Sequence, residues 1–367
     1  MNLDAALKLS DAQLHRLSKP KLEEIQRMTA DWIMNDKRAN QLAYYEPVNE
    51  DARRVHLSTA RRVGLQGGNK SGKTGTMLAE IAIQMTGVIP MSLESVYPRE
   101  KIRPPIRARL VVTSLTSAWD INLKLKLQYF EWSGNVTEDA WECTRCWKAW
   151  PKATTGRDPE CDNCGGEKDV IRFLPGGLTG DLDLGHWGLI PQRFLRNGDW
   201  EQSWSEKHPL LTLTNGSTLQ VMSHDQGLDD FNQGAFHIIG EDEIPPEEIH
   251  RANQIRVIEY GGQILVGGTP ADEWSRSVTQ GWFFDQILTP GLEGVDPEST
   301  FAVELWTEKN RTLNKQRIAD LSAGLTPEQR EARLHGKSLH LSGLVLPGFT
   351  EKPKTWCFRC AGTILTG

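Results

Sequence analysis

Apolar residues recur along the chain in two spacings, which predict alternating helices and strands. Between residues 1 and 42, and again after residue 73, apolar side chains return every three or four positions among polar ones, the pattern of a helix. Short continuous apolar runs predict buried strands at 61–66, 108–115, 235–240, 261–268 and 300–307. Strands that alternate with helices favour an α/β fold, with a mainly parallel sheet covered by helices on both faces.

The segments between these elements contain turn and loop signals. Asn215-Gly216 separates two strand-like runs and predicts a hairpin. A proline-rich loop is expected at 88–107, a helix at 120–130, and a Gly/Pro-rich loop from about 341.

The composition indicates a soluble folded protein but does not identify its function. The chain has 367 residues, of which 38% are hydrophobic and 25% charged, as in an ordinary folded protein. We find no apolar stretch of about 18 residues and no secretory signal, so we expect a cytoplasmic protein that does not enter a membrane. The net charge of −6 neither favours nor excludes nucleic acid, because a local basic surface can act within an acidic chain.

A glycine-rich loop follows the first predicted strand and precedes a helix. It reads "GGNKSGKT" and fits the phosphate-binding pattern G-x-x-x-x-G-K-[ST]. Backbone N–H groups that surround a phosphate leave no room for side chains, which explains the glycines. Lys73 is expected to neutralise the β and γ phosphates of ATP, and the Thr74 hydroxyl to bind Mg²⁺. The predicted nucleotide-binding residues are Gly67, Gly68, Asn69, Lys70, Ser71, Gly72, Lys73 and Thr74.

Three acidic residues follow a later strand, in "FHIIGEDEIPPEEI". An ATPase needs one carboxylate near Mg²⁺ and often a second one that activates water. Two registers are open. Either Asp242 holds Mg²⁺ and Glu243 is the base, or Glu241 and Asp242 take these roles. The local pattern slightly favours the second register, because the metal carboxylate usually follows the apolar run directly.

A hydroxyl at the end of the next strand, in "ILVGGTP", is a candidate sensor of the γ-phosphate. Thr269 would lie beside the strand that carries Glu243. Taken alone this signal is weak, because Gly-Thr-Pro ends many strands for reasons of turn geometry.

The cysteines occur as three C-x-x-C pairs, which favours metal binding over disulfides in a reducing compartment. The first two pairs are separated by fourteen residues, a spacing typical of a structural, tetrahedral Zn²⁺ site without an open position. Its ligands would be Cys143, Cys146, Cys161 and Cys164. Charges of both signs surround this ribbon, so we expect a protein-contact or subunit-contact role. Cys357 and Cys360 form a third pair near the end. We expect a disordered tail there, and the alternative is a partial metal site that is completed elsewhere.

Together these motifs resemble the large terminase subunit of tailed bacteriophages, the motor ATPase that packages DNA. The resemblance covers about residues 40–350 and rests on the order of "GGNKSGKT", "NGSTLQVMSHDQGLDDFNQGAF", "DEIPPEEI" and "GGTP". Relatives place Pro-Pro shortly after an Asp-Glu pair, which implies that Asp242 binds Mg²⁺ and Glu243 is the catalytic base. The resemblance also implies a coupling role for Thr269 and a γ-phosphate contact for Lys70.

Among the residues expected to contact nucleotide, this chain departs from the family pattern at three places. Many relatives carry Arg where this chain has Lys70, and Arg where it has Gln233, the position of a candidate finger that acts on a neighbouring subunit. Arg193 and Arg196 could substitute for that arginine. The glutamine that usually contacts adenine is missing, and only Asn49, Glu50 and Asp51 are available nearby.

The resemblance, together with the helical periodicity at the start of the chain and the cysteine spacing, gives the expected domain organisation. It comprises an N-terminal helical segment (1–45), a P-loop ATPase core of the ASCE type (46–284) with a zinc ribbon inserted at 140–168, a small lid or linker subdomain (285–345), and a tail (346–367) towards a nuclease domain. Residues 354–367 contain no Asp or Glu, so we expect no nuclease activity in this chain.

The resemblance also implies the partners: double-stranded DNA, a portal protein, a small terminase subunit, and further copies of this chain in a ring on the portal. The expected cofactors are ATP, Mg²⁺ and structural Zn²⁺. Two alternatives remain, namely a helicase-like or repair ATPase with a zinc ribbon, and a scaffold that only switches on nucleotide binding. The chain shows no second motor lobe with its own motifs, which argues against a helicase.

Overall fold

The computed structural model describes most of the chain outside the cysteine-rich insertion and the C-terminal segment. The described residues are 8–128, 140–143, 149–151, 171–174, 188–269, 281–311, 313, 318–319, 322–326, 330 and 334–335. Among the described helices, none combines the length and the apolar character that a bilayer crossing requires.

Eight strands form the main sheet, in the order β11-β1-β10-β9-β2-β8-β7-β6. Six neighbouring strands, from β11 to β8, run parallel, and β7 and β6 are antiparallel at one edge. The strands span Arg62–Gly67 (β1), Arg107–Val112 (β2), Trp204–Ser205 (β6), Leu210–Thr212 (β7), Thr218–Ser223 (β8), Ile238–Asp242 (β9), Gln263–Gly268 (β10) and Thr300–Leu305 (β11). The predicted mainly parallel α/β sheet is therefore confirmed.

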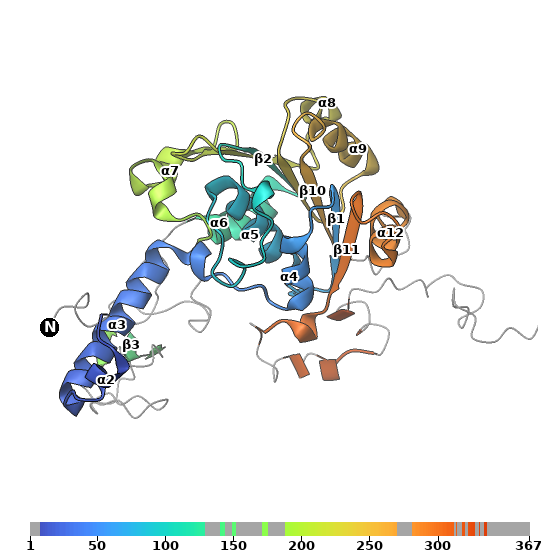
Figure 1. Cartoon of the computed structure of the whole chain (residues 1–367). Coiled ribbons are helices and arrows are strands. Elements are labelled where there is room, and N and C mark those ends of the chain that lie inside the picture. The colour runs from blue at the N-terminus through green and yellow to red at the C-terminus, as the bar shows by residue number, and fades with distance from the viewer. Residues whose placement is uncertain are drawn as a thin grey trace, which may run out of the picture.

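Helices cover both faces of this sheet (Figure 1). The helices with their bounds are α2 (Asp11–Leu14), α3 (Lys19–Ala39), α4 (Glu50–Leu57), α5 (Lys73–Thr86), α6 (Lys124–Leu127), α7 (Trp200–Ser203), α8 (Leu228–Phe231), α9 (Glu247–Arg256), α11 (Gly281–Phe283) and α12 (Thr289–Glu293). A π-helix, η3 (Leu115–Leu123), precedes α6, and a second one, η8 (Phe284–Leu288), precedes α12. Short 3-10 turns are η1 (Gln41–Tyr44), η2 (Arg99–Lys101), η6 (Gln192–Phe194), η7 (Arg196–Gly198) and η9 (Thr307–Lys309). The helix α3 projects away from the main sheet (Figure 1).

Two apolar cores lie on the two faces of the sheet, because successive strand residues point to opposite sides. Leu265 packs with the α5 side chains Met77 and Ile81 in one core, whereas Val266 packs with Ile287 in the other. Glycines allow the helices to approach closely. A Cβ on Gly240 would lie 2.8 Å from the sulfur of Met77.

The strand β11 lies within the segment 285–345, which the sequence predicts as a lid or linker subdomain. It pairs with β1 over its whole length, from Arg62↔Thr300 to Gly67↔Leu305. The helix α12 and η8 pack against it. The main sheet therefore includes this strand up to Leu305.

A separate three-stranded antiparallel sheet belongs to the cysteine-rich insertion. Its order is β4-β3-β5, with bounds Ala140–Cys143 (β3), Ala149–Pro151 (β4) and Ile171–Leu174 (β5). The backbone of Cys143 ends β3, whereas Cys146, Cys161 and Cys164 lie outside the described residues, as do Cys357 and Cys360. No group of metal-binding side chains occurs in the described part of the chain, and the zinc ribbon stays a prediction.

Candidate active site

The glycine-rich loop leaves the carboxyl end of β1 and enters α5 directly. Lys70 and Gly72 both have a positive φ, of 62° and 101°. A Cβ on Gly67 would lie 2.3 Å from the carbonyl oxygen of Leu305, and one on Gly72 would lie 2.5 Å from Val48. Close packing on both sides therefore excludes side chains at these glycines, whatever the loop binds.

Lys73 is buried at the first position of α5, with 6% of its surface exposed. Its ammonium group donates to the carbonyl oxygens of Gly67, at 2.7 Å, and of Gly68, at 2.9 Å. Burial lowers the pKa of Lys73, and the charges of Glu243 and Asp242 oppose this shift. The lysine therefore lies inside the loop, close to both carboxylates.

The loop contacts the acidic strand end through one hydrogen bond. Thr74 Oγ1 donates to Asp242 Oδ1 at 2.7 Å. Burial raises the pKa of Asp242. The hydrogen bond from Thr74 and the positive charges of Lys126 and Lys73 oppose this shift. The negative charge of Glu243 raises the pKa further. Residues 168 positions apart thus meet at the carboxyl edge of the sheet.

Glu243 lies at the turn after β9 in a left-handed backbone conformation, with φ of 74°. Its carboxylate accepts two hydrogen bonds from Thr269, one from the backbone N–H at 3.1 Å and one from the hydroxyl at 3.0 Å. Because β9 and β10 are paired strands, both residues lie at the same sheet edge. The two bonds hold the carboxylate in one orientation.

Glu241 lies on the opposite side of β9 and is fully buried. Its carboxylate accepts from Asn253 Nδ2 at 2.8 Å and lies 2.8 Å from His250 Nδ1. The structure therefore brings Asp242, and not Glu241, to Thr74, which favours the register in which Asp242 binds Mg²⁺ and Glu243 is the base.

The segment after β11 contacts the loop from the other side. Thr307 Oγ1 donates to the carbonyl of Asn69, and Asn310 Nδ2 donates to the carbonyl of Lys70, both at 2.7 Å. The sequence did not predict either contact, because nothing in the local pattern indicates a loop that lies 238 and 240 positions earlier in the chain.

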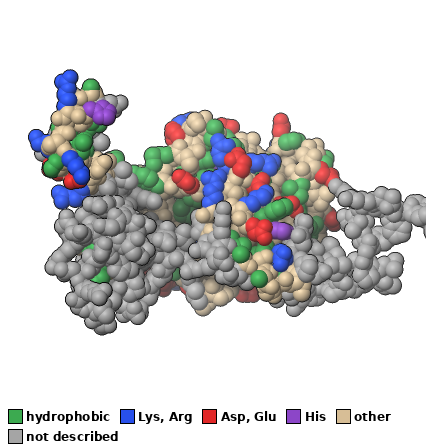
Figure 2. Space-filling model, turned by 90° about the horizontal axis from the view of Figure 1, so that it is seen from below, with side chains coloured by type: hydrophobic (Ala, Val, Ile, Leu, Met, Phe, Trp, Pro, Cys, Tyr) green, Lys and Arg blue, Asp and Glu red, His purple; other side chains and the backbone are tan. Residues whose placement is uncertain are grey.

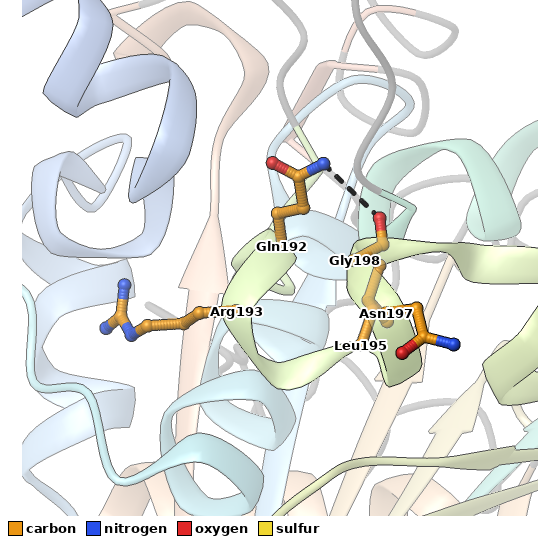
Figure 3. Close-up of a pocket in the computed structure, with 5 residues that line it drawn as sticks. All are labelled: Gln192, Arg193, Leu195, Asn197 and Gly198. Carbon is orange, nitrogen blue, oxygen red and sulfur yellow. Dashed lines mark hydrogen bonds between the residues drawn. The ribbon is translucent and has the colours of Figure 1, made fainter.

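Arg193, Gln233 and Asn49 have other contacts in this structure. Arg193 Nη1 donates to Asn40 Oδ1 at 2.8 Å and points away from the other residues of a cavity of about 560 Å³ (Figure 3). The side chain of Gln233 is exposed, and its backbone oxygen accepts from buried Arg109 at 2.8 Å. Asn49 caps α4 by accepting from Ala52 N at 2.8 Å.

The strand, the loop, the helix and the acidic strand end define a P-loop α/β protein. No protein-family model matches the chain, and no curated protein matches it. Solved structures that are similar to it are large terminases of phages. The large terminase of a thermophilic bacteriophage in complex with ADP has a TM-score of 0.40 and 12% identity, covering 79% of this chain and 53% of its own.

Two further terminases show the same degree of similarity. The large terminase ATPase domain of Thermus phage P74-26 has a TM-score of 0.39 and 13% identity, covering 82% of this chain and 97% of its own. The large terminase of bacteriophage HK97 has a TM-score of 0.39 and 12% identity, covering 76% and 47%. This chain thus spans about half the length of the first and third of these proteins. Similarity at this level does not establish function, which we infer from the site.

Proposed function

We propose that this chain hydrolyses ATP with Mg²⁺ and uses the energy to move double-stranded DNA into a viral procapsid, as the motor portion of a large terminase. The hydrogen bond between Thr74 and Asp242 carries the ATPase part of the proposal, because it joins the phosphate loop to a carboxylate. Glu243, held by Thr269, lies next to that carboxylate.

The donor atoms suit Mg²⁺, which prefers hard oxygen ligands in small numbers beside phosphate and water. Thr74 Oγ1 and Asp242 Oδ1 lie 2.7 Å apart and would both hold the ion. When bound, Mg²⁺ would neutralise charge on the phosphate oxygens.

The chain's own residues would perform the remaining steps. Lys73 would exchange the carbonyls of Gly67 and Gly68 for phosphate oxygens, which are stronger acceptors because they are charged. Glu243 would orient the attacking water and accept its proton on the carboxylate. Thr269 would respond to this step through its two bonds to Glu243, and Thr307 and Asn310 would respond to movement of the loop.

The DNA-moving part of the proposal rests on the sequence resemblance. A motor that pulls duplex DNA uses phosphate contacts, which carry no sequence information. The proposed partners are therefore duplex DNA, a portal ring, a small terminase subunit and further copies of this chain.

Turnover by the wild-type chain should require Mg²⁺ and should rise when duplex DNA is added. The variant Asp242→Asn should lose most of this turnover, by about 10²-fold or more, because it weakens the metal site. The matched control Glu293→Gln removes an exposed carboxylate on α12 and should change nothing. Phosphate release measured with and without DNA tests both parts. An ATP turnover rate that does not change when DNA is added would contradict the motor function. Nucleotide binding without any turnover would support the alternative of a scaffold that switches on nucleotide binding.

We also propose a structural Zn²⁺ bound by Cys143, Cys146, Cys161 and Cys164, on the spacing of these residues. Metal analysis of purified protein should find about one Zn per chain. Cys146→Ser should lose the metal, whereas Cys357→Ser should retain it. A folded, metal-free wild-type protein would refute the site.

A further inference from the structure

The segment that leaves β2 runs along the candidate active site. β2 is the parallel neighbour of β9, with Val111 paired to Glu241, so η3 and α6 begin at the same sheet edge as Asp242. The strands' carboxyl ends point down in Figure 1, and Figure 2 shows Lys and Arg side chains beside Asp and Glu at the centre of that face. The helix α6 packs against α5, and Leu127 anchors it in the core.

Two lysines on α6 have different surroundings. Residues two positions apart point about 200° apart around a helix. Lys124 lies 4.0 Å from the carboxylate of Glu206 and over the ring of Trp204, on the side of the β6–β7 hairpin. Lys126 points the other way, and among the described residues its ammonium group has no hydrogen bond or ion pair.

The charged groups that influence Lys126 belong to the candidate phosphate site. The charges that act on it are those of Asp242, which attracts it, and of Lys70, which repels it. Its charge lowers the pKa of Asp242 more than the charge of Lys73 does. Together with the position of α6 at the sheet edge of β9, this places Lys126 within electrostatic reach of the carboxylate that would hold Mg²⁺.

The backbone of this lysine is held in place. The carbonyl of Lys126 accepts from Leu189 N at 2.7 Å, and that of Leu127 accepts from Ile190 N at 3.0 Å. Lys126 is half-buried, and burial lowers its pKa, so the free chain does not stabilise its charge well. An anionic ligand between Lys70 and Asp242 would supply a partner that the described residues do not provide.

We propose that Lys126 contacts the terminal phosphate of a nucleoside triphosphate bound in the same chain, in addition to Lys73. This proposal rests on the proposed ATPase function and adds a second cation at the γ-phosphate. Such a cation stabilises the charge that develops during phosphoryl transfer. It also lets the site distinguish a triphosphate from a diphosphate.

Binding measurements test the contact without turnover. Lys126→Ala should weaken binding of a non-hydrolysable ATP analogue by about 10- to 100-fold, the loss expected for one charged hydrogen bond. Its affinity for ADP should stay within about twofold of the wild type, which also shows that the variant folds. Lys126→Arg should recover part of the loss, and Lys124→Ala should bind both nucleotides normally. Equal weakening of both nucleotides, or of neither, overturns the proposal.

Mixing experiments test whether the lysine acts within its own chain. Lys126→Ala should lower turnover by about 10²-fold or more. Mixing it with inactive Glu243→Gln should restore nothing, because each chain then lacks part of its own site. Restored turnover in the mixture would show that Lys126 acts on a neighbouring subunit. If Lys126→Ala lost only the increase in turnover caused by DNA, the lysine would be a DNA contact. Both results reject the proposal. A wild-type chain without turnover rejects the proposed function, whereas active wild type with an unaffected variant rejects only the role of Lys126.

Discussion

Glu243→Gln is expected to abolish ATP turnover and to leave nucleotide binding nearly unchanged. The substitution removes a proton acceptor, and a positioned general base contributes about 10² to 10⁴ in rate. The amide of Gln has the same shape as the carboxylate, and its oxygen can still accept from the backbone N–H of Thr269. The loss should therefore appear in kcat, while the affinity for a non-hydrolysable ATP analogue stays the same.

Single-turnover kinetics and nucleotide binding on the same preparation measure this effect. Thr269→Ser is the matched control, because it retains the hydroxyl that donates to Glu243 at 3.0 Å and should retain most turnover. Normal turnover by Glu243→Gln would contradict the role of this residue as the base and would favour the register with Glu241 and Asp242.

The phosphate loop could be predicted because its requirements are local. A strand, glycines at crowded positions, a lysine and a hydroxyl residue at the helix start all follow one another in sequence, and the structure shows them as β1, the loop and α5. The hairpin at Asn215-Gly216 could also be predicted, because Gly216 takes the positive φ of 87° that this turn requires.

The register of the acidic strand could not be chosen from the apolar pattern. The strand β9 is buried on both faces, so its residues show no alternation of polar and apolar positions. Without alternation, the only local sign is the distance from the apolar run, and it slightly favours Glu241, whereas the structure brings Asp242 to Thr74. The positive φ of Glu243 could not be predicted from the sequence either, because Glu has no preference for the left-handed region.

Contacts between distant segments account for the other omissions. Lys126 lies in a helix with no motif, and its relation to Asp242 depends on β2 and β9 being neighbours. The position of β11 depends on its pairing with β1, 238 positions earlier at Arg62 and Thr300. The buried carboxylate of Glu80 falls within an apolar helix whose pattern gives no sign of its partners.

Glu80 is the centre of a buried polar network between α4, α5 and η2. Its carboxylate lies 2.6 Å from Lys101 Nζ and 2.7 Å from His56 Nδ1. It also accepts from the hydroxyl of Tyr97 and from Gln84 Nε2, both at 2.8 Å. Burial by itself would raise the pKa of Glu80, but Lys101 and His56 outweigh it and lower this pKa from 4.5 to about 2. The network holds α4 and η2 against the phosphate-loop helix.

Glu80→Gln should therefore destabilise the protein strongly, because it leaves the buried ammonium of Lys101 without its countercharge. Removing one partner of a buried pair typically costs about 3–5 kcal/mol of unfolding free energy. The control Glu94→Gln breaks the exposed pair with Arg99 and should cost less than about 1 kcal/mol. Denaturant unfolding at neutral pH measures both changes.

The same carboxylate predicts how stability depends on pH. Because the folded state lowers the pKa of Glu80, its contribution is complete above pH 4.5 and is lost as the pH falls towards about 2. One pKa unit corresponds to about 1.4 kcal/mol, so the shift amounts to about 3 kcal/mol. Between pH 4.5 and 2, the unfolding free energy of Glu80→Gln should fall less steeply than that of the wild type. Parallel curves for the two proteins would mean that this carboxylate is not held ionised by its buried partners.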